Sequence, residues 1–272
     1  MLPLIPMMQS AQPLQNKRAA TVGSSSAADI DSVTQLVFDP LSAGDPDKIC
    51  AAWVSVLPEQ TTGGKGDLMQ RVAARRDPLL TLEQSVSTLN LIYDLINGLD
   101  QSQPRVPLIV AVSAENLIAP ELIYLLKSRQ EAYPEVAPLI YLALSGTEIG
   151  QKDTQLLEQL RYLKGLGYGL VLTELGRSME TMDLLRLVPV DLVSFDSGLL
   201  PGTLDAETLS AHWFRAILAM LKELAVPVLL PAALQAQASG GCWSCPDNRK
   251  PLDHSAFRAR LTNQNAPDSA AD

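Results

Sequence analysis

Short aliphatic segments alternate with longer amphipathic segments along most of this chain, and this alternation restricts the fold more than any other feature. Parallel strands that are buried on both faces are continuous aliphatic runs, whereas surface helices carry an apolar stripe with a period near 3.6 residues. An alternating order of the two predicts a parallel sheet covered by helices. Aromatic residues are only 5% of the chain, so Leu, Ile, Val and Ala must supply the core.

Eight segments have strand character and five have helix character. The predicted strands are 35–38, 49–57, 106–113, 139–144, 169–173, 191–196, 227–231 and 241–244. The predicted helices are 82–99, 120–130, 153–166, 179–187 and 206–224. Eight strands with helices between most of them predict an α/β fold of the (β/α)8 TIM-like barrel type.

The connection between the first two predicted strands departs from this pattern. Residues 39–48 contain Pro and Gly and are too few for a crossover helix. Parallel neighbours need a connection of about a dozen residues or more, whereas antiparallel neighbours can be joined by a short turn. The first strand is therefore predicted to run antiparallel to the rest.

Composition changes at both ends of the alternating region. Residues 1–33 are rich in Ser, Ala, Gln and Pro and show no apolar period, and residues 263–272 are similar. Such segments are typical of flexible tails. The predicted organisation is an N-terminal tail, 1–33, a barrel domain, 34–262, and a C-terminal tail, 263–272.

Net charge and cysteine content exclude several classes of protein. The formal charge is −9 and the isoelectric point about 4.8, which disfavours binding to a nucleic-acid backbone. No apolar run reaches the roughly 20 residues of a membrane span, and the N-terminus lacks the charged start of a secretory signal. Three cysteines, an odd number, favour a reducing compartment, so we expect a cytoplasmic protein.

One stretch carries a family resemblance. Residues 162–200 read YLKGLGYGLVLTELGRSMETMDLLRLVPVDLVSFDSGLL, which is helix end, strand, loop, helix and strand. This stretch resembles the central part of the EAL domain family, where the two strands end in Asp-Asp-Phe-Gly and Lys-x-Asp. The corresponding residues here are Thr173-Glu174-Leu175-Gly176 and Ser194-Phe195-Asp196. The resemblance extends over about residues 35–261, and an antiparallel first strand also belongs to that family.

The resemblance implies a barrel whose active members hydrolyse cyclic di-GMP with two metal ions at the carboxyl ends of the strands. Mg²⁺ and Mn²⁺ prefer carboxylate and amide oxygens as ligands. Two such ions activate a water molecule and neutralise the charge that develops on the phosphate.

Most positions that correspond to the family's metal ligands and catalytic residues hold other residue types. Trp53 stands at the Glu of the Glu-Ala-Leu motif, and the Arg after that motif falls at Leu57. The remaining replaced positions are Ala111, Ala143, Gly146, Thr173, Ser194, Pro231 and Leu234, although Ser113 is kept and Glu148 lies near the fourth strand. The resemblance therefore implies a degenerate site.

Three charged residues remain candidates for chemistry. Glu174 and Asp196 could form a residual acidic site, or be hydrogen-bonded acids at the starts of loops. Arg177 could replace the family's phosphate-binding Arg as a nucleotide contact, or be a solvated surface charge.

Two further groups have weaker patterns. Cys242-x-x-Cys245 with His254 has partial zinc-ligand spacing, or closes the last strand with small half-buried residues. Arg71, Arg75 and Arg76 fall in the segment that covers the barrel mouth in EAL proteins, and form either a site for an acidic partner or a solvated face.

These observations lead to one expected function and two alternatives. We expect a catalytically inactive EAL-like module that regulates or binds another protein in bacterial cyclic di-GMP signalling. The alternatives are a receptor that binds cyclic di-GMP without hydrolysing it, and a residual phosphodiesterase. No cofactor is expected, with Mg or Mn needed only for residual activity. Residues 179–187 fall where EAL domains often dimerise, and their apolar positions either form a homodimer interface or pack on the barrel.

Overall fold

The computed structural model describes residues 35–43, 45, 48–57, 81–99, 104–149, 154–200, 209–231, 234, 242–245 and 251–264. The strands in chain order are β1 (Gln35–Leu41), β2 (Ala51–Leu57), β3 (Leu108–Ala111), β4 (Ile140–Ser145), β5 (Gly169–Leu175), β6 (Leu192–Phe195), β7 (Val228–Pro231), β8 (Cys242–Cys245) and β9 (Leu252–Asp253). The helices are α2 (Leu82–Asn97), α3 (Ala114–Leu117), α4 (Pro120–Ala132), α5 (Thr154–Gly165), α6 (Met179–Leu187), α7 (Leu209–Glu223) and α8 (His254–Asn263). The predicted tail 1–33 lies outside the described residues.

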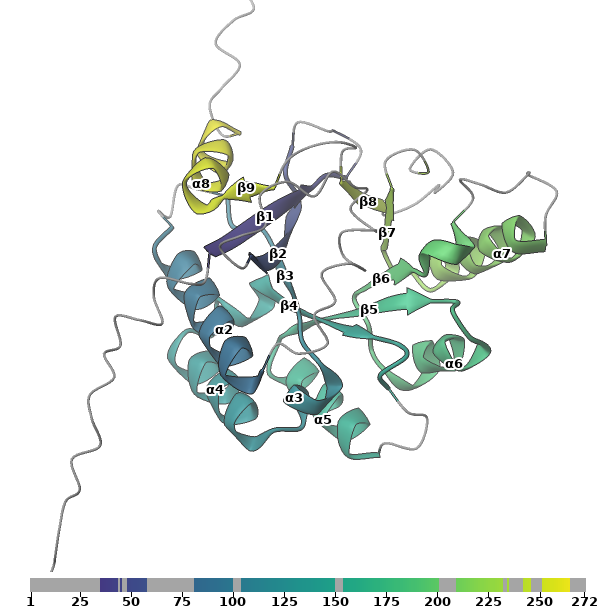
Figure 1. Ribbon diagram of the computed structural model, residues 1–272, viewed down its shortest axis with the longest axis horizontal. Helices are drawn as coiled ribbons and strands as arrows, with labels where there is room; N and C mark the ends of the chain where they lie inside the picture. The colour runs from purple at the N-terminus through teal and green to yellow at the C-terminus, as the bar shows by residue number, and fades with distance from the viewer. Residues whose placement is uncertain are drawn as a thin grey trace, which may run out of the picture. The chain divides into compact units, whose positions relative to one another are not determined.

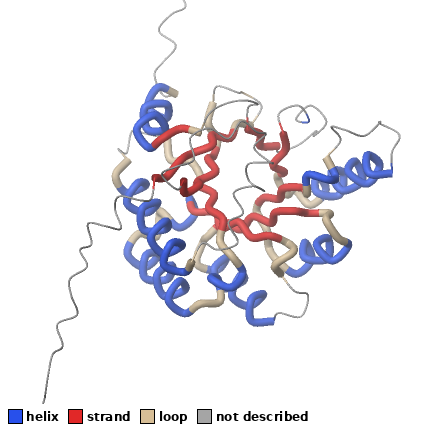
Figure 2. The backbone as a smooth tube through the Cα atoms, in the orientation of Figure 1, coloured by secondary structure: helices blue, strands red, loops and turns tan. Residues whose placement is uncertain are grey.

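All nine strands form one curled sheet in the order β8-β7-β6-β5-β4-β3-β2-β1-β9 (Figures 1 and 2). Each neighbouring pair from β2 to β8 is parallel, and β1 is antiparallel to both of its neighbours. Two backbone hydrogen bonds between Ser42 and Ser244, of 2.8 and 2.9 Å, connect the end of β1 to β8. The predicted α/β barrel type and its antiparallel first strand are confirmed.

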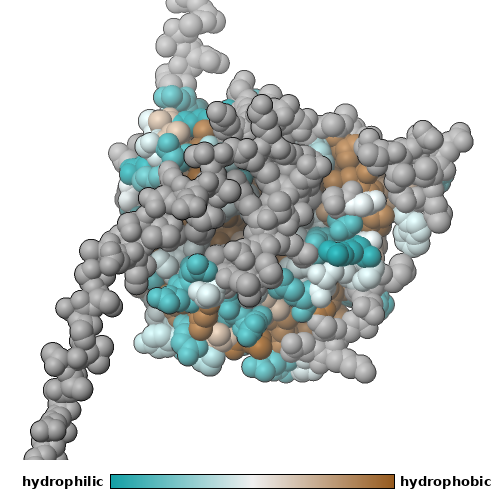
Figure 3. Space-filling view, in the orientation of Figure 1, coloured by the Kyte–Doolittle hydropathy of each residue, from teal (hydrophilic) through white to brown (hydrophobic). Residues whose placement is uncertain are grey.

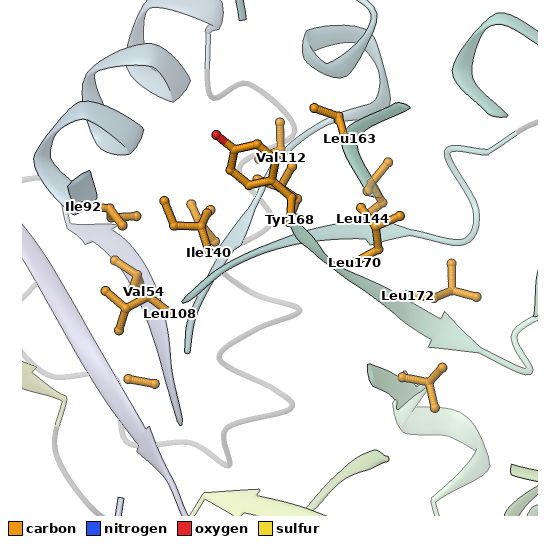
Figure 4. Close-up of a cluster of buried hydrophobic side chains, with 14 of the residues drawn as sticks. Val54, Ile92, Leu108, Val112, Ile140, Leu144, Leu163, Tyr168, Leu170 and Leu172 are labelled. Carbon is orange, nitrogen blue, oxygen red and sulfur yellow. The ribbon is translucent and has the colours of Figure 1, made fainter. Parts of the chain in front are cut away.

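The sheet separates two hydrophobic clusters. The larger one, the outer cluster, lies between the sheet and its helices and includes Val54, Leu108, Ile140 and Leu170. Figure 4 shows these side chains with Tyr168 between strands and helices. The smaller one, the inner cluster, consists of Leu41, Ala51, Trp53, Ile109, Ala143, Val171, Leu192 and Leu229, the residues on the opposite face of the strands. Alternation along each strand therefore assigns one set of side chains to the barrel interior.

Local signals explain where several helices begin. Thr81 and Gln84 form a capping box at the start of α2, with hydrogen bonds of 3.0 and 3.2 Å. Pro120 occupies the first turn of α4, as the sequence predicts. The predicted helix 82–99 ends two residues early, because Gly98 caps it.

The C-terminal β9 and α8 were not among the predicted elements. Asp253 caps α8 by accepting a hydrogen bond from the Ala256 N–H at 2.8 Å, and His254 is the first residue of the helix. The ring of Phe257 stacks on Phe38 of β1, with 4.5 Å between ring centroids. The helix includes Asn263, where the sequence predicts that a tail begins. Because β9 has two residues, its signal is too short to read from sequence.

Among the described residues, no helix combines the length and apolarity that a membrane span requires. Figure 3 shows hydrophilic and hydrophobic residues interspersed on the visible face, outside the parts drawn in grey.

Candidate functional site

The carboxyl ends of the parallel strands β2 to β8 meet at one edge of the sheet, which we call the mouth. Hydrogen-bond register aligns Ala111 with Ala143, Ala143 with Val171, and Ser145 with Thr173. Trp53 and Ala143 belong to the inner cluster, so both point into the barrel. By alternation with Leu192 and Leu229, Ser194 and Pro231 face the same way.

The positions that replace metal ligands are mostly filled with apolar or small side chains. Trp53 and Ala143 are each 3% exposed and Ser194 is 1% exposed. The Thr173 hydroxyl donates to the Leu144 carbonyl at 3.1 Å, so it is used within the sheet. Leu234 differs from the others because it belongs to the outer cluster. These residues supply none of the carboxylate oxygens that Mg²⁺ or Mn²⁺ would need.

Ala111 is an exception to this filling. It ends β3 on the inward face and is exposed, although Val110 and Val112 on either side are buried. A small residue therefore borders open space at the end of β3, next to the filled interior.

Glu174 has an unusual backbone. Its φ is 60°, in the left-handed region that β-carbon residues occupy at a cost of about 1–3 kcal/mol. It lies in a register shift between Leu172 and Leu175, where β5 bulges relative to β6. A bulge re-aims the side chains of a strand, and here it directs the Glu174 carboxylate toward the loop after β4.

Three side chains hold the Glu174 carboxylate. Its Oε2 accepts from the Ser145 hydroxyl at 2.7 Å and from the Thr147 hydroxyl at 3.0 Å. Its Oε1 accepts from the Arg177 guanidinium at 3.0 Å. The Glu174 side chain is 13% exposed and that of Arg177 is 53% exposed. Glu174 is thus a largely buried acid that is bonded within its own chain.

Asp196 and Glu148 are also used locally. The Asp196 Oδ1 accepts from the Gly198 N–H at 2.9 Å, at the start of the short 3-10 helix Ser197–Leu199. The Glu148 Oε2 accepts from the Ala114 N–H at 2.9 Å, and so caps α3 together with Ser113. Within the described ranges, no three His, Cys, Asp or Glu side chains are grouped to hold a metal ion. The described acids at the mouth therefore do not fit a two-metal centre.

The candidate zinc ligands lie on different elements: Cys242 and Cys245 are the first and last residues of β8, and His254 begins α8. Cys242 begins β8 and is buried, and its pKa is raised to about 11 by burial and by the nearby Cys50. Burial likewise raises the pKa of Cys50 to about 11. Burial therefore favours the protonated form of both thiols, whereas zinc binds the thiolate. His254 is exposed at the start of α8, and the side chain of Cys245 lies outside the described residues.

Two groups of predicted residues cannot be placed. Arg71, Arg75 and Arg76 lie outside the described ranges, as does the side chain of Leu57. Ser145 and Thr147 were not predicted as partners of Glu174. Their signal is two hydroxyl residues at and just beyond the end of β4, the sheet neighbour of β5.

The fold defines a class of protein: an α/β barrel with one antiparallel strand and a mouth at the carboxyl ends of its parallel strands. The model of the EAL domain matches residues 79–231, more than half of the chain. The chain belongs to the EAL domain family.

Solved structures agree with this assignment. The chain is similar to the EAL enzyme Bd1971 in its cAMP- and cyclic-di-GMP-bound form, with 13% identity and a TM-score of 0.64 over 86% of this chain and 66% of that one. It is also similar to the PaMucR phosphodiesterase in complex with c-di-GMP, with 13% identity and a TM-score of 0.64 over 82% of this chain and 99% of that one. The EAL domain of Mycobacterium smegmatis DcpA is 14% identical, with a TM-score of 0.63 over 85% of this chain and 97% of that one. The chain thus spans slightly less than two thirds of Bd1971, and these likenesses concern the fold.

No curated protein sequence matches the chain.

Proposed function

We propose that this EAL domain is catalytically inactive and acts as a regulatory, protein-binding module in cyclic di-GMP signalling. One observation carries the proposal: inward-facing positions in the second halves of β3, β4 and β6 hold Ala111, Ala143 and Ser194, where a two-metal site needs carboxylate or amide oxygens. Two-metal catalysis requires both ions about 3.5–4 Å apart to position water and leaving group. A barrel with this interior keeps a concave surface without the reaction.

The acids that remain support the same proposal. Glu174 is held by Ser145, Thr147 and Arg177, and Asp196 is held by the Gly198 N–H. A metal bound by Glu174 and Asp196 would have to displace these contacts. A residual phosphodiesterase is therefore the least supported of the three functions.

Hydrolysis is the direct test. We expect purified protein with Mg²⁺ or Mn²⁺ to convert cyclic di-GMP no faster than buffer, measured by chromatography of the products. Hydrolysis by the wild type that is lost in the Glu174→Ala and Asp196→Ala double variant would instead establish a residual enzyme. Hydrolysis that survives in this variant would also contradict the inactive assignment and would place the chemistry elsewhere.

A second candidate function is a receptor that binds cyclic di-GMP without hydrolysis. It is favoured by the exposed Ala111 at the mouth and by the exposed side chain of Arg177, which is suited to a phosphate. Isothermal titration with cyclic di-GMP, with and without Mg²⁺, tests it. Metal-independent micromolar binding, about −8 kcal/mol, would support the receptor. No heat at millimolar nucleotide would leave the protein-binding function alone.

Homodimerisation through α6 remains a prediction. Leu184 of that helix is buried, and Met182, Leu185 and Leu187 pack against the outer cluster. These apolar side chains contribute to the barrel's own core, so sedimentation of the purified chain is the appropriate test of a dimer.

A further inference from the structure

Glu174 and Arg177 form an ion pair at the mouth, three residues apart in the chain. The Arg177 guanidinium donates to the Glu174 Oε1 at 3.0 Å, while Oε2 faces the hydroxyls of Ser145 and Thr147. One carboxylate therefore has two different sides: one against the end of β4 and the loop that follows, and one against a largely exposed cation.

The two sides differ in how firmly they are held. The Ser145 hydroxyl also lies 2.7 Å from the Thr147 hydroxyl and accepts from the Thr147 N–H at 3.1 Å. Ser145 is buried, and Gly146 donates to the Thr173 carbonyl at 2.9 Å, so this loop is fastened to β5. Glu174 itself is fixed by its left-handed backbone in the bulge. The carboxylate is anchored on the hydroxyl side.

Arg177 is held less firmly. More than half of its side chain is exposed, and an ion pair in such surroundings contributes little because water screens it. Its guanidinium has five N–H donors, in a planar arrangement that matches the oxygens of a phosphate. Among the described residues, Glu174 is the acid that forms an ion pair with it. Arg177 can therefore leave Glu174 for another anion, while Glu174 stays.

We propose that Glu174 is an internal competitor that occupies Arg177 and repels phosphate, so that phosphate-bearing ligands bind the mouth weakly until this ion pair opens. The inference rests on the receptor function proposed above and concerns its regulation. A phosphate that approaches Arg177 must replace the Glu174 carboxylate and then remain close to its negative charge. Both effects reduce affinity, and both depend on the charge of one side chain.

Glu174→Gln separates this inference from a structural role. The amide oxygen of Gln still accepts from Ser145 and Thr147, but the charge that holds Arg177 and repels phosphate is gone. Isothermal titration of cyclic di-GMP into the full chain, in EDTA to exclude metals, measures the effect. We expect Glu174→Gln to bind at least tenfold tighter than wild type, and the added Arg177→Ala change to abolish that gain.

Glu148→Gln is the matched control. It removes one negative charge near the end of β4, but Glu148 contacts the Ala114 N–H rather than Arg177. We expect wild-type affinity from this variant. If Glu174→Gln unfolds, Glu174→Asn repeats the test, because Asn tolerates a left-handed backbone.

Three results would overturn the inference: equal binding, or equal absence of binding, by wild type and Glu174→Gln; a gain that persists without Arg177; or the same gain in Glu148→Gln. Hydrolysis by the wild type would contradict the inactive assignment but not this competition, so the two proposals fail separately.

Discussion

The ring of Tyr141 lies directly over Gly169, its register partner on β5, so closely that a β-carbon on residue 169 would come within 2.3 Å of the ring. Tyr141 in turn contacts Trp243 of β8 in the inner cluster, with 6.2 Å between ring centroids. A residue without a side chain on β5 therefore allows two aromatic rings from β4 and β8 to meet on the inner face of the sheet.

Replacing Gly169 with Ala is expected to destabilise the fold by about 1–3 kcal/mol, because the Tyr141 ring must move from its packed position. Urea denaturation measures the change. Gly165→Ala is the control, since a β-carbon there would meet no described heavy atom within 4 Å apart from its chain neighbours and its own helix backbone. It should be neutral or slightly stabilising. Equal losses in both variants would show that the Tyr141 ring is not responsible.

The buried hydroxyls of Tyr93 and Tyr168 are hydrogen-bonded to each other, and Tyr168 donates to the Leu126 carbonyl at 2.7 Å. Tyr168 therefore accepts from Tyr93. Tyr168→Phe is expected to cost about 1–3 kcal/mol, because it leaves the Tyr93 hydroxyl buried without its acceptor. Tyr93→Phe should cost less, since Tyr168 keeps its bond to Leu126.

A double-mutant cycle by chemical denaturation checks this asymmetry. Adding Tyr93→Phe to Tyr168→Phe should recover part of the loss, because the orphaned hydroxyl is removed. Strictly additive losses would mean that the two hydroxyls act independently.

The pKa of Asp253 is lowered from its ordinary value of 3.8, chiefly by the Ala256 N–H and next by the Ser255 hydroxyl. Because the pKa of Asp253 is lower in the folded state, its carboxylate stabilises the fold fully at pH values above its unfolded-state pKa. This stabilisation is lost as the pH falls through its folded-state pKa. We therefore expect this contribution to decline below about pH 4.

Asp253→Asn retains a capping side chain but cannot titrate. The melting temperature of the wild type should exceed that of the variant at neutral pH, and the difference should shrink in acid. A difference that is constant with pH would show that the charge of Asp253 plays no part.

Asp191 has two roles at the start of β6. Its Oδ2 accepts from the Leu170 N–H at 2.8 Å, and its Oδ1 pairs with Lys164 at the end of α5. Both side chains are about one third exposed, so the ion pair is expected to contribute at most about 1 kcal/mol. Lys164→Met should therefore cost less than Asp191→Ala, which also leaves the Leu170 N–H without its acceptor. Chemical denaturation at 0.1 and 1 M salt measures the free energy of unfolding of both variants. A larger loss in Lys164→Met than in Asp191→Ala would contradict this expectation.

Much of the fold was predictable because its signals are local. Apolar runs predict β2 to β8 to within a few residues, the short connection before β2 predicts an antiparallel β1, and Pro120 predicts the start of α4. The short α3 and β9 were missed because four and two residues show no period. The start of α8 has a readable signal in Asp253 and His254, and buried Phe257 and Leu261 continue it, although the segment lies beyond the last helix predicted from the apolar period.

The sequence by itself determined which residue types stand on the inward face of the strands, and so the scarcity of metal ligands there. Covalent order and strand alternation suffice to place Trp53, Ala143 and Ser194 on that face. Only the tertiary structure decided which groups the remaining acid meets. Glu174 bonds to Ser145 and Thr147 across 29 and 27 residues of chain, and does so because β4 and β5 are neighbours and a left-handed residue turns its side chain between them. The hydroxyl residues can be found in the sequence, but their contact with Glu174 depends on strand register and backbone geometry, which the order of residues along one strand does not specify.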